Sequence, residues 1–198
     1  MPRLLIATGN TGKIAEMEAL IGDRAEVISL AEAGIESPEE TGTTFEENAA
    51  LKAVNAARES GLVTVADDSG IEVDALGGAP GVRSVRYAGD DATDEQNIAK
   101  LLHELEGVPD EARTAGFVSV IVVATPDGRA RAFRGTLEGM VGRSPRGGGG
   151  FGYDPVMVLG DGRTVAELEP GEKNGISHRG TALRNALPYI HELLDSGA

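Results

Sequence analysis

The sequence predicts an α/β protein built on a mixed β-sheet, and three observations lead to this fold class. Through the first hundred residues, apolar segments of strand length alternate with segments of helical periodicity, an order typical of α/β proteins. Two long strand-like segments then follow one another without a helix between them, which indicates a β-hairpin. A chain of 198 residues, 40% of them hydrophobic, is long enough to bury such a sheet as one large domain or two small lobes.

Six segments have the composition of strands. They span residues 3–7, 27–30, 63–66, 117–125, 130–140 and 156–159. The turn sequence Pro126-Asp127-Gly128 separates the fourth segment from the fifth, so residues 117–140 are expected to form a long hairpin. Because a hairpin joins antiparallel strands, the sheet is expected to be mixed, with aliphatic packing between the layers.

Four segments have helical periodicity, at residues 11–21, 45–60, 94–106 and 180–194. Two of them are preceded by capping boxes, Thr44 with Glu47 and Thr93 with Gln96. Pro188 is expected to kink or split the last helix. Two glycine-rich segments, 77–81 and 147–150, are candidate hinges between two lobes.

Charge and composition exclude several classes of partner and site. The formal net charge of −14 argues against a nucleic-acid polymer, which requires a basic face. It is compatible with a small anion, and an acidic protein that binds triphosphate is expected to use a divalent cation. The chain contains no cysteine, which excludes disulfides, thiolate zinc sites and cysteine nucleophiles. Without an apolar segment of membrane-spanning length or a signal segment, a soluble, cytoplasmic protein is expected.

A candidate phosphate site follows the first predicted strand. Residues 8–13 read Thr-Gly-Asn-Thr-Gly-Lys and open the first predicted helix. The N–H groups and positive dipole end of a helix attract anions, while Lys13 adds a charge and Asn10 an amide. The segment is not a P-loop, since Ala7 and Ile14 replace the glycine and the Ser or Thr of that motif. An ordinary strand–helix turn with a solvated lysine is the alternative.

Two aspartates, Asp67 and Asp68, come directly after the third predicted strand, at the edge where α/β sheets bind ligands. Because neighbouring strand side chains point to opposite faces, the two cannot do the same job unless the chain turns between them. One is expected to bind Mg²⁺ or activate water while the other fixes the loop. One residue of the acidic pair Glu39 and Glu40 is a candidate second Mg²⁺ ligand, and Lys52 lies on the following predicted helix. A polar turn and a solvated loop are the alternatives.

Two further segments suit recognition of a nucleotide base. Phe151 and Tyr153 follow four consecutive glycines and offer a stacking surface for a planar base, or else an aromatic plug. Lys173, His178 and Arg179 are hydrogen-bond donors when protonated and precede the last predicted helix. Such donors suit a keto oxygen better than an amino group, and the alternative is a helix-capping segment.

In order and spacing, these segments resemble the inosine triphosphate pyrophosphatase family, in particular its bacterial members that act on dITP and XTP. The resemblance rests on T-G-N-T-G-K at 8–13, E-E-T-G at 39–42, E-N-A-x-x-K-A at 47–53, A-D-D-S-G at 66–70, G-G-A-P-G-V at 77–82, F-G-Y-D-P at 151–155 and I-S-H-R-G at 176–180. It implies a long central mixed β-sheet with two α/β lobes flanking an active-site cleft, a single domain over residues 1–198, and a homodimer.

The resemblance also implies an activity, the hydrolysis of purine nucleoside triphosphates with a 6-keto base (ITP, dITP, XTP) to the monophosphate and pyrophosphate, with Mg²⁺ as cofactor. The implied catalytic residues are Asp68 as proton acceptor, Lys13 and Lys52, and the implied metal ligands are Glu40 and Asp68. The residues implied to contact substrate are Thr8, Gly9, Asn10, Thr11, Gly12, Lys13, Ser69, Phe151, Gly152, Tyr153, Asp154, Lys173, His178 and Arg179.

Three other functions stay open on the sequence. One is a Mg²⁺-dependent phosphatase with Asp67 or Asp68 as a covalent nucleophile. Such enzymes, however, usually have one residue between the two aspartates, which are adjacent in this chain. The second is a house-cleaning pyrophosphatase that acts on other modified nucleotides. The third is a nucleotide sensor that binds without hydrolysis. The released product distinguishes the phosphatase, which yields orthophosphate, from a pyrophosphatase, and a panel of nucleotides distinguishes the other functions.

Overall fold

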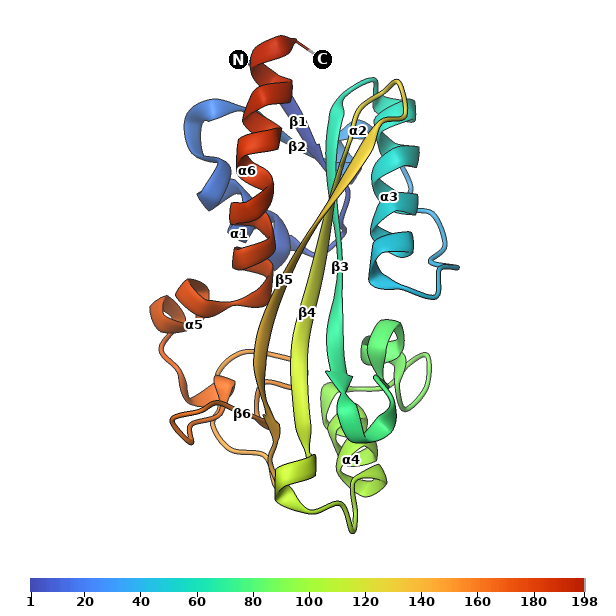
Figure 1. Cartoon of the computed structure of the whole chain (residues 1–198). Coiled ribbons are helices and arrows are strands. Elements are labelled where there is room, and N and C mark those ends of the chain that lie inside the picture. The colour runs from blue at the N-terminus through green and yellow to red at the C-terminus, as the bar shows by residue number, and fades with distance from the viewer. Residues whose placement is uncertain (198) are drawn as a thin grey trace. The chain divides into compact units, whose positions relative to one another are not determined.

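The computed structural model describes residues 1–197, without the side chains of Thr11 and Glu16, and contains a mixed β-sheet with helices (Figure 1). The strands are β1 (Arg3–Ile6), β2 (Glu26–Ser29), β3 (Val63–Val73), β4 (Thr114–Ala124), β5 (Ala130–Val141) and β6 (Met157–Val158), in the sheet order β2-β1-β3-β4-β5-β6. β1 pairs in parallel with β2 and β3, whereas β5 and β6 are antiparallel. The predicted mixed α/β fold is confirmed.

The helices agree with the sequence patterns where capping residues mark their ends. They are α1 (Thr11–Ile21), α2 (Leu30–Ala33), α3 (Phe45–Ser60), α4 (Asp94–Glu104), α5 (Pro170–Ile176) and α6 (His178–Ser196), with 3₁₀ turns at Gly22–Arg24, Asp74–Leu76, Gly81–Arg86, Asp110–Ala112 and Val165–Glu167. Both predicted capping boxes are formed, before α3 and before α4. Pro188 lies inside α6, which continues through it, so the helix is not split. The short helices α2 and α5 were not predicted.

None of the helices among residues 1–197 combines the length and the apolar character needed to cross a membrane.

The chain divides into two compact units. Unit 1 comprises residues 1–68, 119–135 and those from 179 to the end of the described chain, and unit 2 comprises residues 69–118 and 136–178. The chain therefore passes from one unit to the other within β3, β4 and β5 and at the start of α6. Both predicted hinges, 77–81 and 147–150, lie inside unit 2, so the hinge prediction is wrong. A single domain over the whole chain stays a prediction.

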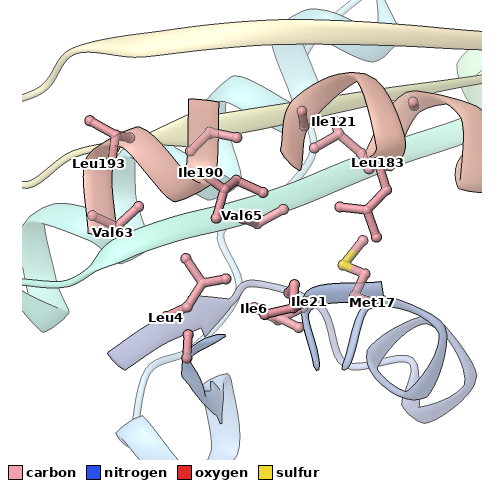
Figure 2. Packing of buried hydrophobic residues seen from close by; sticks show 14 residues of the cluster. Leu4, Ile6, Met17, Ile21, Val63, Val65, Ile121, Leu183, Ile190 and Leu193 are labelled. Atoms are coloured by element: carbon pink, nitrogen blue, oxygen red, sulfur yellow. The ribbon is translucent and has the colours of Figure 1, made fainter. Parts of the chain in front are cut away.

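Unit 1 has an aliphatic core between its part of the sheet and two helices. α1 and α6 cover one face of that part, and α3 covers the other (Figure 1). Figure 2 shows the first of these layers, whose buried side chains include Leu4, Ile6, Met17, Ile21, Val63, Val65, Ile121, Leu183, Ile190 and Leu193. The prediction of aliphatic packing is confirmed for this core.

Unit 2 has a separate core in which aromatic side chains take part. It joins β3 and β4 to α4 and to the segment around β6, through residues that include Ile71, Val73, Tyr87, Ile98, Leu101, Phe117, Tyr153 and Met157. The segment between β5 and β6 is packed against this core, because Tyr153 belongs to the core.

β3 is much longer than predicted. The sequence patterns placed the end of this strand at Ala66, with the two aspartates directly after it, but β3 continues to Val73. Charged side chains can remain inside a strand when they are paired, and Asp67 is paired with cations far from it in sequence. Further along β3, a Cβ on Gly70 would lie 2.3 Å from the Ser84 hydroxyl oxygen, so glycine is needed there for close packing and not for a turn.

Candidate functional site

The aspartates of β3 face opposite sides of the sheet. Asp67 follows Val63 and Val65 in the alternation of the strand and meets residues of α1 and α6. Asp68 points to the other face and accepts a hydrogen bond from α3. Because successive side chains of a strand point to opposite faces of the sheet, the two carboxylates have different partners.

Asp67 is a fully buried carboxylate held by two cations. Its Oδ2 atom lies 2.7 Å from Nζ of Lys13 and 3.3 Å from Nε of Arg179. Burial raises the pKa of this carboxyl, but the charges of Lys13 and Arg179 outweigh that effect, and the pKa is lowered to about 2. A carboxylate without exposed surface and with so low a pKa is a poor general base at neutral pH.

Asp68 keeps a small exposed surface of 8%. Its Oδ2 atom accepts a hydrogen bond of 3.0 Å from Nδ2 of Asn48, which is itself buried in α3. The amide oxygen of Asn48 accepts from the backbone N–H of Gly42 at 2.8 Å. Asn48 therefore connects Asp68 to the loop before α3. The sequence reasoning gave Asn48 no role, although an asparagine among alanines inside a helix, where it is a poor helix former, was a usable signal.

Glu40 and Lys52 form an ion pair beside α3. Nζ of Lys52 lies 2.6 Å from Oε1 of Glu40, and the lysine is buried while the glutamate is half-buried. Lys52 is therefore not the ordinary solvated lysine that was the alternative interpretation. The structure brings together two predicted site residues here.

The start of α1 is capped by its own asparagine. Oδ1 of Asn10 accepts from the backbone N–H groups of Gly12 and Lys13, at 2.9 and 3.2 Å, and the backbone N–H of Asn10 donates to Oγ1 of Thr8. Two of the N–H groups expected to face a phosphate are thus already satisfied within the turn. In this structure Asn10 acts as a helix cap.

Three other predicted contact residues remain untested. Gly9 is exposed, and Ser69 is half-buried in β3. The side chain of Thr11 lies outside the described part of the chain, so its predicted contact stays a prediction.

In unit 2, the aromatic loop (residues 151–155) contains one exposed and one buried ring. Phe151 is 56% exposed, and Nζ of Lys173 lies 4.6 Å from the centre of its ring. Tyr153 is buried and donates its hydroxyl hydrogen to the carbonyl of Ser84 at 2.7 Å, and burial raises the pKa of Tyr153. Tyr153 is therefore a plug, whereas Phe151 is exposed and its stacking on a base stays a prediction.

A buried carboxylate shapes the aromatic loop. Oδ2 of Asp154 accepts from the backbone N–H of Phe151 at 2.9 Å and from Nζ of Lys173 at 2.6 Å. Gly150 has a φ of +77°, and a Cβ there would lie 2.0 Å from Oδ2 of Asp154. Glycine is therefore required at this position for the Asp154 contacts to form.

Asp94 is a second residue that the sequence reasoning missed. Its Oδ2 atom accepts from the backbone N–H of Gly152 at 2.6 Å, which fastens the aromatic loop to the start of α4. Acidic residues are common in the first turn of a helix, so nothing in the sequence distinguishes this one from an ordinary helix-terminal acid.

The three predicted base-reading donors have different surroundings. Lys173 lies in α5 beside Asp154, and the His178 ring stacks on Phe117 with 5.1 Å between ring centres, all within unit 2. Arg179 belongs to unit 1, where it is buried against Asp67 and not solvated. The convergence of both sets of residues on one substrate stays a prediction.

The oxygen ligands for a metal ion are few. Among residues 1–197, no group of three or more His, Asp or Glu side chains is placed to hold an ion. Mg²⁺ is, however, commonly bound by one or two carboxylates together with water and substrate phosphate oxygens. Glu40 and Asp68, both partly accessible hard-oxygen donors in unit 1, fit that mode of binding and not an all-protein cage.

Comparisons with known proteins extend over almost the whole chain. The model of the Ham1 family matches residues 4–189. A protein of Symbiobacterium thermophilum named dITP/XTP pyrophosphatase is 50% identical over 198 residues, covering 98% of each chain. The structure of a HAM1 protein from Coxiella burnetii has a TM-score of 0.92 at 44% identity, covering 97% of this chain and 100% of that one. A nucleoside-triphosphatase, or dITP/XTP pyrophosphatase, from Mycobacterium abscessus has a TM-score of 0.82 at 44% identity, covering 94% and 99%.

Proposed function

Because this chain belongs to the Ham1 family, we propose that it hydrolyses the non-standard purine nucleoside triphosphates dITP, XTP and ITP to the monophosphate and pyrophosphate. Such an activity removes these compounds from the nucleotide pool. The membership confirms the resemblance found in the sequence, and a relative that is 50% identical over 98% of the chain is named for dITP and XTP.

The observation that carries the mechanism is the difference between the two adjacent aspartates. A general base must reach the water that it deprotonates. Asp68 retains exposed surface, whereas Asp67 has none and is committed to two cations. We therefore assign proton acceptance to Asp68. The same burial makes Asp67 unsuitable as the covalent nucleophile of a phosphatase.

In the proposed reaction, a water molecule attacks the α-phosphorus in line with the leaving group. A bond forms between the water oxygen and the α-phosphorus, and the bond between the α-phosphorus and the bridging oxygen breaks. Pyrophosphate leaves with that oxygen, while Asp68 accepts the water proton. Lys13 and Lys52 stabilise the growing negative charge. Each lysine is held by a carboxylate, Asp67 or Glu40 respectively, which orients its ammonium group before substrate binds.

Glu40 and Asp68 are the residues that would hold Mg²⁺. When bound, this ion neutralises phosphate oxygens and lowers the pKa of water. Asn48 supports this role indirectly, because its hydrogen bond to Oδ2 of Asp68 limits the orientations of the carboxylate.

Base selection is proposed for Lys173, His178 and Arg179, with Phe151 as the stacking surface. These donors pair with a 6-keto oxygen, whereas the 6-amino group of adenine would leave donors facing each other without acceptors. Sites that depend on such hydrogen bonds can reject a mismatched analogue by about 10⁴–10⁵ in kcat/KM. We expect a large preference for ITP over ATP that becomes smaller in Arg179→Ala, and an unchanged preference would place base reading elsewhere.

A nucleotide panel tests the proposal. ITP, dITP, XTP, ATP, GTP and dUTP are incubated with the protein, with and without Mg²⁺, and pyrophosphate and orthophosphate are assayed separately. Pyrophosphate from ITP, dITP and XTP, dependent on Mg²⁺, is the expected result, with little or none from ATP, GTP or dUTP. Orthophosphate release would indicate a phosphatase, a preference for modified pyrimidines would indicate the house-cleaning alternative, and binding without products would indicate a sensor.

Assembly, partners and location are further proposals. The homodimer rests on the family resemblance, and light scattering after size-exclusion chromatography tests it. The net charge of −14 supports the absence of a nucleic-acid polymer as partner. The cytoplasmic location, without a membrane partner, rests on composition and is tested by fractionation of the source cells.

A further inference from the structure

Two cations from opposite ends of the chain share a single oxygen atom. Lys13 in α1 and Arg179 in α6 both contact Oδ2 of Asp67, at 2.7 and 3.3 Å. The other carboxylate oxygen, Oδ1, is buried and has no hydrogen-bond partner among residues 1–197. The two cations therefore compete for one acceptor.

Burial prevents solvent from relieving this competition. The side chain of Asp67 has no exposed surface, and those of Lys13 and Arg179 are 18% and 6% exposed. If one cation moves away, water does not simply replace it, and the electrostatic attraction of the buried carboxylate acts on the cation that remains. The position of each cation thus depends on the other.

The two cations have different roles in the proposed function. Lys13 is assigned to the phosphate groups and Arg179 to the base. A phosphate that draws Lys13 away from Oδ2 leaves this oxygen to Arg179, whose present contact is the longer one. A guanidinium group that is already immobilised loses less conformational entropy when it binds a ligand.

From this geometry we propose that Asp67 is a positioning residue that couples the two ends of the substrate, so that occupation of the phosphate subsite increases affinity for the base. The proposal rests on the proposed function, because it takes the assignments of Lys13 and Arg179 from it. It adds a source of selectivity, since a triphosphate on the enzyme improves base reading before hydrolysis.

Binding of substrate fragments tests the coupling. The Kd of inosine is measured by calorimetry with and without saturating inorganic pyrophosphate, at one Mg²⁺ concentration throughout. We expect pyrophosphate to tighten inosine binding by about five-fold or more, the lower end of typical coupling between sites. Reciprocity requires inosine to tighten pyrophosphate binding by the same factor.

Two variants and a control test whether Asp67 transmits the coupling between the phosphate subsite and the base. In Asp67→Asn the effect of pyrophosphate on inosine should disappear. In Lys13→Met, Arg179 already has Oδ2 to itself, so inosine should bind about five-fold more tightly than to the wild type even without pyrophosphate. A gain in affinity is not expected from a residue with a merely structural role. Asp161→Asn, at an exposed aspartate paired with Arg163, is the matched control and should behave as wild type.

The proposal is overturned if pyrophosphate leaves inosine affinity unchanged in the wild type, or if Asp67→Asn retains the full coupling. It is also overturned if Lys13→Met binds inosine no more tightly than the wild type, and this arm decides even if Asp67→Asn fails to fold. Release of pyrophosphate from ITP by the wild type is assayed in parallel, so that failure of the coupling is distinguished from failure of the proposed function.

Discussion

Unit 1 and unit 2 hold their candidate site residues in different ways. In unit 1, the charges are part of the interior, since Asp67 lies in the middle of a strand and its partners come from two helices packed on the core. In unit 2, the candidate recognition surface is a loop, whose exposed ring Phe151 is positioned by glycine and by Asp154. Substitution of the fully buried Asp67 should therefore affect stability and catalysis together, whereas substitution of the exposed Phe151 should affect affinity.

The largest effect is expected for Asp67→Ala. Removal of this carboxylate deletes the ion pairs that Lys13 and Arg179 form with it, and breaking a buried ion pair costs about 3–5 kcal/mol of the free energy of unfolding. Urea denaturation measures this loss. Asp161→Ala, in an exposed ion pair, should change the unfolding free energy by about 1 kcal/mol or less. Similar urea midpoints for Asp67→Ala and Asp161→Ala would contradict the view that the buried charges of unit 1 contribute to its stability.

Asp68→Asn should separate catalysis from stability at the neighbouring position. The amide cannot accept the water proton, and loss of one well-placed group in an active site typically lowers kcat by about 10²–10³. Because the change preserves shape and Asp68 keeps some exposure, the denaturation midpoint should remain close to that of the wild type. Steady-state kinetics with ITP at saturating Mg²⁺ measure the loss, and full turnover would contradict the assignment of the base.

Acid should weaken unit 1 through Asp67. Its pKa is lowered from 3.8 to about 2 in the folded protein, so its contribution to stability is present above pH 4 and is lost as the pH falls towards 2. The contribution is about 2 kcal/mol. Denaturation of wild type and Asp67→Asn between pH 7 and pH 2.5 measures it, and the difference between the two unfolding free energies should narrow below pH 4. A constant difference would show that this carboxylate is not a source of acid sensitivity.

Phe151→Ala should raise KM with little change in stability, the reverse of what is expected for Asp67→Ala. Stacking of a base on an aromatic ring contributes about 1–3 kcal/mol, so KM for ITP should rise by about five-fold or more. The ring is 56% exposed, and the unfolding free energy should change little. A large loss of stability with unchanged KM would mean that the ring is a packing residue like Tyr153.

Gly150→Ala should disturb the loop through its backbone. The positive φ of this residue costs about 1–2 kcal/mol for a residue with a Cβ, and the new methyl group would collide with Asp154. We expect a higher KM for ITP with a smaller change in kcat. Gly148→Ala is the matched control, because a Cβ there has open space, and equal KM values for the two variants would contradict the close packing at Gly150.

Local signals determined much of this protein. Capping residues and helical periodicity predicted α1 and α3 with their observed ends, because both act within a few residues of the chain. The alternation of strand side chains predicted that Asp67 and Asp68 face opposite sides of the sheet. Family motifs predicted a site role for Lys52, and its burial beside Glu40 shows that it is not the solvated lysine that its pattern alone indicated.

Tertiary structure decided the partners of the charged residues. Asp67 and Arg179 are 112 positions apart in the chain, and no periodicity or cap extends over that distance. Their pairing keeps Asp67 inside β3, although the sequence patterns predicted that the strand ends at Ala66. The hydrogen bond from Asn48 to Asp68 likewise depends on tertiary structure, because Asn48 lies in α3 and Asp68 in β3, which begins after α3 has ended. Secondary structure follows from short-range preferences along the chain. A buried charge is tolerated only where folding places an opposite charge beside it, and this depends on the whole fold.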